Sequence, residues 1–197
     1  MMNETQAPQR SWPRRLALVA VIASAVVLAA MLFISNADGP VFVFAGGPLQ
    51  SGERVELAAI EWSELDRLTE LELEIVAEAT SLTLWFSVHD GVPYVACDLD
   101  CVGGRLERWP QQIARDDRVA VRIDGKLAEG RLVHIPHETP EYTRVRAGRN
   151  QKYSGDGGGR AAAETAAHGT VVEVGEILTG RASREEPGDR LYRISPR

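Results

Sequence analysis

A long apolar segment near the N-terminus constrains this chain more than any other feature of its sequence. The run LALVAVIASAVVLAAMLFI extends from Leu16 to Ile34 without a charged residue. A helix needs about 20 predominantly apolar residues to cross the roughly 30 Å hydrocarbon core of a bilayer. The sequence therefore predicts one transmembrane helix over residues 16–34, preceded by a tail of residues 1–15 and followed by a linker of residues 35–45.

The charges on either side of this run predict its orientation. Arg10, Arg14 and Arg15 precede it, whereas Asn36 and Asp38 follow it. Positive residues concentrate on the cytoplasmic side of membrane proteins. We therefore expect a cytoplasmic N-terminus and a single pass through a bacterial-type inner membrane. The rest of the chain is then expected on the periplasmic or extracytoplasmic side.

The alternative is a cleaved signal peptide, because Ser35 and Ala37 fit the small-residue pattern for cleavage before Asp38. The apolar run is longer than the usual core of a signal peptide, which favours retention of the helix. Both alternatives export the remaining residues.

Residues 46–197 have the usual size of one domain with its own hydrophobic core. The whole chain carries a formal net charge of -6, with a sequence pI of about 5.3. Proteins that bind nucleic acid present a basic face to the phosphates. The charge balance therefore argues against nucleic acid as a partner.

Two Asp-Gly pairs predict β-hairpins, because Asp-Gly favours the two-residue turn between antiparallel strands. With Asp90-Gly91 in the turn, Phe86 faces Val95, and Trp85, Ser87, His89 and Tyr94 lie on the face away from the core. The predicted core face of this hairpin carries Leu82, Leu84, Phe86, Val88, Val95 and Cys97.

The second hairpin turns at Asp124-Gly125, which pairs Ile123 with Lys126. Its predicted core face carries Val119, Val121, Ile123, Ala128, Gly130 and Leu132, and its other face carries Arg118, Arg122, Glu129 and Arg131. One buried face and one charged face are typical of an antiparallel sheet.

Further β-type runs are residues 55–60, ELELEIVAEA at 70–79, GTVVEVGEIL at 169–178 and RLYRIS at 190–195. The run at 70–79 also suits a helix by composition, but its strict alternation favours a strand. Helices are expected at residues 109–115, from 140 to about 152, and at 159–168. Many short strands with few helices indicate a mainly β sandwich or barrel, and the barrel is favoured because it leaves no exposed strand edges.

Several segments are similar to a known superfamily: GGPLQSG, LWFSVHDGVPYVACD, RWPQQIARDDRVAVRIDGKLAEGRLV and RLYRISPR. They resemble a membrane-anchored branch of the split β-barrel superfamily, which includes pyridoxine-phosphate oxidases and flavin- or deazaflavin-binding nitroreductase-like proteins. The resemblance implies a split antiparallel β-barrel over about Gly46 to Arg197. In this chain Gln112-Ile113 stands where Asn-Leu is common, and the Gly-Arg-x-Ser-Gly segment that helps bind cofactor phosphate in deazaflavin relatives is absent.

The resemblance also implies a cofactor, FMN or a deazaflavin, and a tendency to form homodimers. Arginine suits phosphate oxygens, and the candidate cofactor-binding residues are Arg105, Arg108, Trp109, Arg122 and Lys126. Trp109 is the candidate ring contact, and the cations are candidates for the phosphate. The alternatives are that the cations are solvated surface charges and that Trp109 is a packing anchor.

Two other residue groups are candidates for chemistry. Cys97 and Cys101 suit a disulfide in an exported domain, with free thiols or a metal site as the alternatives. His134 and His137 are weak candidates for haem because a third ligand is missing, so haem is less favoured than a flavin and no metal is predicted. No Ser-His-Asp order or paired catalytic carboxylates stand out.

Two functional hypotheses follow. The first is a membrane-tethered flavin- or deazaflavin-binding barrel that acts as an oxidoreductase of the nitroreductase or quinone-reductase kind, where the cofactor carries the redox chemistry. The second is a cofactor-free envelope binding or assembly module on the same barrel.

Overall fold

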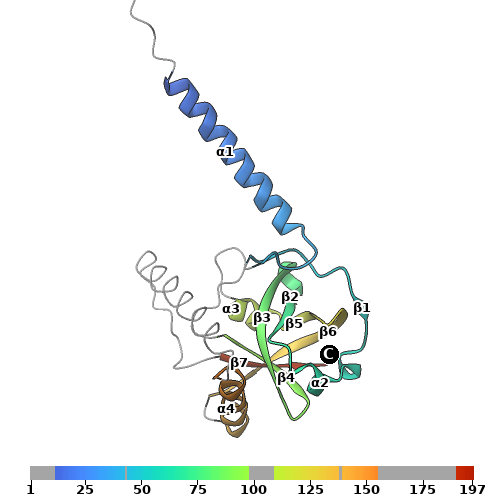
Figure 1. Cartoon of the computed structure of the whole chain (residues 1–197). Coiled ribbons are helices and arrows are strands. Elements are labelled where there is room, and N and C mark those ends of the chain that lie inside the picture. Colours follow the sequence, from blue (N-terminus) through green and yellow to red (C-terminus); the bar gives the residue numbers. More distant parts are fainter. Residues whose placement is uncertain (1–11, 43, 98–108, 138, 155–189) are drawn as a thin grey trace, which may run out of the picture.

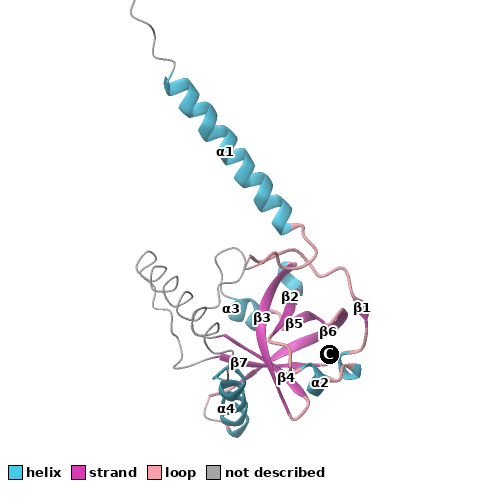
Figure 2. Cartoon of the chain, viewed as in Figure 1, coloured by secondary structure: helices cyan, strands magenta, loops and turns pink. Residues whose placement is uncertain are grey.

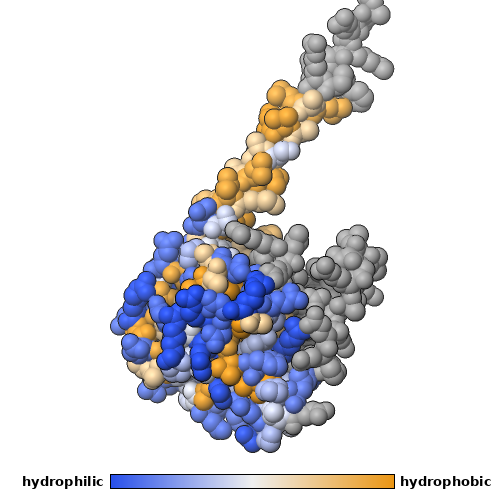
Figure 3. Space-filling view, turned by 180° about the vertical axis from the view of Figure 1, so that it is seen from behind, coloured by the Kyte–Doolittle hydropathy of each residue, from blue (hydrophilic) through white to orange (hydrophobic). Residues whose placement is uncertain are grey.

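An isolated N-terminal helix precedes a β-barrel in the computed structural model (Figure 1), which describes residues 12–42, 44–97, 109–137, 139–154 and 190–197. Helix α1 spans Trp12–Ser35 and projects away from the strands. Within the described ranges, Leu16–Ser35 is the one helix long and apolar enough to span a membrane, and none of it is buried in the protein. Hydrophobic residues gather along this helix, whereas the barrel surface is largely hydrophilic (Figure 3).

Six antiparallel strands close into a barrel (Figure 2), so the mainly β prediction is confirmed. The strands are β2 (Glu70–Ile75), β3 (Thr80–His89), β4 (Val92–Cys97), β5 (Arg118–Ile123), β6 (Lys126–Ile135) and β7 (Arg190–Ser195). They follow one another around the barrel in the order β6-β5-β2-β3-β4-β7, and pairing of β6 with β7 closes it. Strand β1 (Glu53–Arg54) pairs in parallel with β6 outside this ring.

Both predicted hairpins have the predicted register. Phe86 pairs with Val95 across β3 and β4, and Ile123 pairs with Lys126 across β5 and β6. In the turns, φ is +51° and +76° at Asp90-Gly91, and +49° and +75° at Asp124-Gly125. Two positive φ values mark the type I′ turn, whose twist matches that of the strands it joins.

The alternating run that begins at Glu70 is a strand, β2, as its pattern predicts. The prediction of a strand over residues 55–60 is wrong. The strand in this region is the two-residue β1 at Glu53–Arg54. It is followed by a 3-10 helix, η1, at Leu57–Ala59 and by helix α2 at Trp62–Leu65. These short turns bury Leu57, Ile60, Trp62 and Leu65 in the barrel core, which a flat strand at this position would not do.

Helix α3 occupies Trp109–Arg115 and α4 occupies Pro140–Ser154, close to the predicted bounds. The C-terminal run forms β7. The predicted helix at 159–168 and strand at 169–178 lie outside the described residues.

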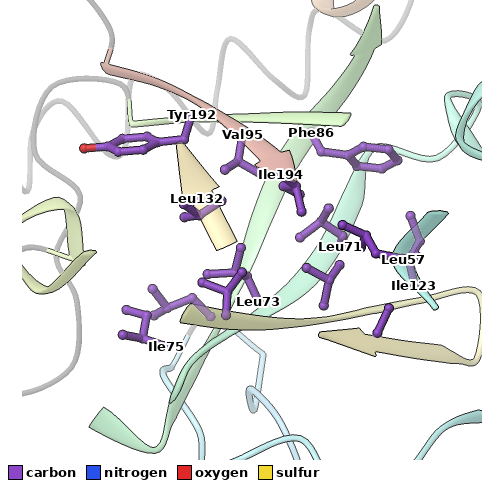
Figure 4. Close-up of a cluster of buried hydrophobic side chains, with 14 of the residues drawn as sticks. Leu57, Leu71, Leu73, Ile75, Phe86, Val95, Ile123, Leu132, Tyr192 and Ile194 are labelled. Carbon is purple, nitrogen blue, oxygen red and sulfur yellow. The ribbon is translucent and has the colours of Figure 1, made fainter. Parts of the chain in front are cut away.

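Apolar side chains fill the barrel interior (Figure 4). One end is closed by η1 and α2, where the ring of Trp62 meets that of Phe86 edge-on with centroids 6.3 Å apart. The other end is closed by α3, where the Trp109 ring lies 4.9 Å from that of Tyr192. A barrel of eight strands is already just wide enough for its own side chains, so this narrower barrel is a packed core and any ligand must lie outside it.

Two segments cover the outside of the barrel. Helix α4 packs over one side in a second apolar cluster, which consists of Tyr94, Ala96, Ile135, Tyr142, Val145 and Leu191. The chain that follows α1 covers another side, where Leu49 packs against Ala120 of β5 and Leu127 of β6. Helix α4 contacts β3 of the first hairpin, where Tyr153 stacks on the outward-facing Trp85.

Candidate functional site

The predicted cofactor residues do not come together in one place. Arg105 and Arg108 lie outside the described residues. Trp109 is 1% exposed and belongs to the core cluster inside the barrel. Arg122 projects from the outer surface of β5, on the other side of the barrel wall, where it contacts the chain that follows α1.

Lys126 lies directly after the β5–β6 turn and is half-buried. Its neighbour in the ladder is Glu53 of β1. Among the described residues its amine makes no ion pair. It therefore stays available to an anion, but it is not part of the same cluster as Trp109.

The end of the barrel at α3 holds two buried polar atoms without partners. Within the described part of the chain, neither the indole Nε1 of Trp109 nor the side-chain Oε1 of Gln112 has a hydrogen bond. Gln112 is 3% exposed. The two residues are three positions apart on α3, a spacing that places them on the same side of a helix. Buried polar groups in native proteins nearly always have partners, so this donor and this acceptor need an explanation.

Local contacts fix α3 in this position. Pro110 follows Trp109 at the start of the helix, where its missing N–H is not needed. At the other end, Arg115 donates to Glu78 over 3.1 Å and so ties α3 to the turn after β2. Asp116 then accepts hydrogen bonds from the side chain and backbone of Arg118, which lower the pKa of Asp116 to about 2.

Arg122 is the centre of a charged cluster that we call the linker clamp, formed by Asp38, Ser51, Glu72 and Arg122. The guanidinium donates to Asp38 Oδ1 over 2.8 Å, to the Asp38 carbonyl over 3.0 Å and to Ser51 Oγ over 2.9 Å. Its Nε donates to the carboxylate of Glu72 on the neighbouring strand β2. The clamp joins the barrel to a residue three positions beyond the end of α1.

Asp38 also binds the chain on its other side. Its carboxylate accepts a hydrogen bond from the backbone N–H of Gln50 over 2.7 Å. Hydrogen bonds from the Ser51 side chain, and then from the Gln50 backbone, hold the pKa of Asp38 well below its ordinary value. The carboxylate is therefore charged at every physiological pH.

Four further hydrogen bonds hold the following residues on the barrel. The backbone N–H of Leu49 donates to the buried carboxylate of Glu74 over 2.9 Å, and Ser81 Oγ donates to the Gly47 carbonyl over 2.6 Å. Gly46 and Ser81 exchange two backbone hydrogen bonds of 3.0 and 3.1 Å. The sequence predictions missed these roles. The Gly46-Gly47 pair was the available signal, because adjacent glycines mark close backbone approach.

The contact between α4 and the barrel holds a second polar cluster that the sequence did not indicate. Lys152 donates to Asp66 Oδ1 over 2.9 Å and to the Phe86 carbonyl over 3.0 Å, and burial lowers the pKa of Lys152. The rings of Trp85 and Tyr153 stack with centroids 5.1 Å apart. These contacts attach α4 to β3.

Tyr94 and Glu141 connect β4 to the start of α4. Tyr94 donates to Glu141 over 3.0 Å, and Arg193 of β7 donates to the same oxygen over 2.9 Å. Burial, and then the hydrogen bond to Glu141, raise the pKa of Tyr94 from 10.0 to about 12.

The remaining candidates are structural where the structure describes them. Cys97 is buried in the core and disulfide-bonded; Cys101 lies outside the described residues, so the pairing of these two stays a prediction. The His134 ring lies 5.4 Å from Tyr192, and that of His137 lies 4.4 Å from Tyr142. No group of three metal-binding side chains occurs among the residues that the structure covers.

Comparison with known proteins does not assign a family. No family model matches the chain, and no curated protein matches it significantly. Among solved structures, the chain is similar to the crystal structure of an FAD-binding protein from Mesorhizobium loti, with a TM-score of 0.38 and 14% sequence identity. That similarity covers 71% of this chain and 88% of the other. The closed barrel follows from the strand pairings themselves, and this likeness adds no evidence about a ligand.

Proposed function

We propose that this chain is a membrane-tethered barrel that binds a flavin-type cofactor, FMN or a deazaflavin, at the end covered by α3. The observation that supports the proposal is the buried, unpartnered pair of Trp109 Nε1 and Gln112 Oε1. A buried polar group without a partner costs about 1–3 kcal/mol. A ligand that accepts one hydrogen bond and donates another would remove this cost at both atoms.

The pyrimidine edge of a flavin-type ring fits that requirement, because it presents carbonyl oxygens beside an N–H group. The described residues supply the donor and the acceptor, and the Trp109 ring behind them packs on Tyr192. The basic residue of α3, Arg115, is bonded to Glu78. In this proposal the phosphate contacts come from Arg105 and Arg108, which precede α3 in the sequence.

Arg122 has another role in this proposal. Its guanidinium is bonded to Asp38, Ser51 and Glu72, and it lies outside the barrel wall. It holds the chain that follows α1 on the barrel, and it takes no part in binding the cofactor at the α3 end.

A flavin-type cofactor would supply hydride or electron transfer, while the protein binds and orients it. The reaction class that we infer is reduction of a nitro- or quinone-type acceptor. Helix α1 would hold the barrel at the membrane, and the three arginines before it favour the exported side for the barrel.

The absorbance spectrum of the purified full-length chain tests this proposal, followed by titration with FMN, FAD and a deazaflavin. Tryptophan emission should be quenched as the cofactor binds. Gln112→Leu should weaken binding about tenfold, which corresponds to the loss of about 1.4 kcal/mol. The same change should leave the stability of the ligand-free protein equal or higher, because it replaces an unpartnered buried acceptor by an apolar group.

Trp85→Phe is the matched control, because Trp85 lies under α4 and away from α3. It should leave the affinity unchanged. A colourless protein whose emission none of the three cofactors quenches would refute cofactor binding. That result favours the second candidate, a cofactor-free envelope binding or assembly module, which the packed interior and the engagement of Arg122 support.

A further inference from the structure

An exposed apolar turn lies between α1 and the barrel. Val41 and Phe44 exchange two backbone hydrogen bonds of 3.1 and 3.0 Å, so the chain reverses direction between them. Phe42 is 91% exposed and Phe44 is 60% exposed. In the described ranges these two are the exposed large hydrophobic side chains outside α1. Large apolar side chains exposed this close together in a chain are typical of a surface that contacts a membrane or another protein.

Backbone contacts fix the base of this turn. A Cβ atom added to Gly46 would lie 1.7 Å from the carbonyl oxygen of Gly39, so the two ends of the turn touch. A Cβ atom added to Gly47 would lie 2.8 Å from the carbonyl oxygen of Ser35, the last residue of α1. The turn therefore starts from a rigid base at the end of the helix.

The backbone of Phe42 adopts an unusual conformation. Its φ of +56° is uncommon for a residue with a bulky side chain, and glycine would adopt it at lower cost. The chain thus has an aromatic residue at a position where glycine would have a lower conformational energy. A role for the aromatic ring in binding would account for this cost.

The position along the membrane normal suits lipid contact. The 20 residues of Leu16–Ser35 are about 30 Å long at 1.5 Å per residue, so Ser35 lies at the edge of the hydrocarbon core. The headgroup layer beyond it is about 5–7 Å thick. Phe44 is two residues from Gly46, a reach of about 7 Å at most. Figure 1 shows the segment after α1 at the end of the barrel that faces this helix.

We propose that the Val41–Phe44 turn is a second membrane contact, in which Phe42 and Phe44 enter the boundary between headgroups and acyl chains beside α1. The inference rests on the membrane tether of the proposed function and does not depend on the cofactor. Aromatic side chains are favoured at this depth. A single helix leaves the tilt of a domain against the membrane surface free, and a second contact at its side limits that tilt.

Nitroxide labels in the full-length chain, reconstituted into phosphatidylcholine–phosphatidylglycerol vesicles, test the inference. The label is placed by Phe42→Cys, with Val27→Cys in α1 as the lipid reference and Glu64→Cys in α2 as the aqueous reference. Labelling of the wild-type chain measures the background from its own cysteines. Collision with oxygen, which concentrates in lipid, is compared with collision with a water-soluble nickel complex.

The ratio of oxygen to nickel accessibility at position 42 should be several-fold higher than at position 64. Phe44→Ser should lower the ratio at position 42. A lipid-like value at position 27 with a water-like value at position 42 overturns the turn contact and leaves the tether intact. A label at position 42 shielded from both reagents indicates contact with a second copy and also overturns it. A water-like value at position 27 overturns the tether itself.

Discussion

Replacing Arg122 by methionine should loosen the chain that follows α1 from the barrel. The guanidinium makes three described hydrogen bonds of 2.8 to 3.0 Å to Asp38 and Ser51, in addition to its bond to Glu72. Hydrogen bonds to charged groups contribute about 1.5–3 kcal/mol each. The carboxylates of Asp38 and Glu72 are 37% and 32% exposed, so water screens them and the bonds do not add fully. We expect a net loss of about 2–3 kcal/mol in the free energy of unfolding.

For a domain of this size, 1 kcal/mol corresponds to about 2–4 °C in the unfolding midpoint. Arg122→Met should therefore lower the midpoint by about 5–10 °C, measured on the full-length chain in detergent by near-ultraviolet circular dichroism. Arg118→Met is the matched control. Arg118 lies on the same strand and the same outward face, but it pairs with Asp116 only two residues away. Its replacement should leave the midpoint unchanged, and equal shifts for the two variants would contradict the clamp.

The dependence of the free energy of unfolding on acidic pH is a second test of the linker clamp. Asp38 has a pKa well below its ordinary value in the folded chain, first through Ser51. As the pH falls below about 4, the Asp38 carboxylate is therefore protonated in the unfolded chain while it is still charged in the folded chain. The stability linked to Asp38 is complete above that pH and is lost progressively below it. Ser51→Ala should flatten this acid dependence, and an unchanged slope would argue against the assigned hydrogen bond.

Further outcomes are expected for four other variants. Tyr94 has its pKa raised to about 12, so the stability linked to it is present below its ordinary pKa of 10.0 and is lost toward pH 12. Tyr94→Phe should remove that loss, together with one late-appearing phenolate in an ultraviolet titration. Gly46→Ala should lower the unfolding midpoint, because the new Cβ meets a backbone oxygen at 1.7 Å. Gly148→Ala in α4, where nothing lies within 4 Å, should instead raise the midpoint slightly. Lys152→Met should speed hydrogen exchange in α4, because it removes the ion pair with Asp66.

The parts of the fold that the sequence predicted depend on local signals. In each hairpin the Asp-Gly pair sets the turn, and the alternation of residues on both sides sets the register. The alternation from Glu70 similarly identified β2 in spite of its helix-favouring composition. The failure at residues 55–60 has the opposite cause, because the need to close the barrel end overrides the β propensity of a short apolar run.

The linker clamp was not predictable for a related reason. Arg122 lies 84 positions from Asp38 and 50 from Glu72, and no local pattern relates such residues. The outward arginines of β5 looked alike in the sequence, and only the folded chain distinguishes Arg122 from Arg118. At α3 the sequence likewise did not decide between two roles for Trp109, a packing anchor or a contact of the cofactor ring. Its ring packs on Tyr192 while its N–H stays unpaired, so the two roles are compatible.

The short distance between α1 and the linker clamp has a mechanical consequence. A flexible tether lets a domain sample many orientations, because each free residue adds two soft dihedral angles. Here only Asn36 and Ala37 separate Ser35 at the end of α1 from Asp38 in the clamp. Asn36 is itself bonded back to the helix at the Leu32 carbonyl over 2.8 Å. The barrel is therefore held in one orientation relative to α1, and the bonds of the linker clamp set that orientation.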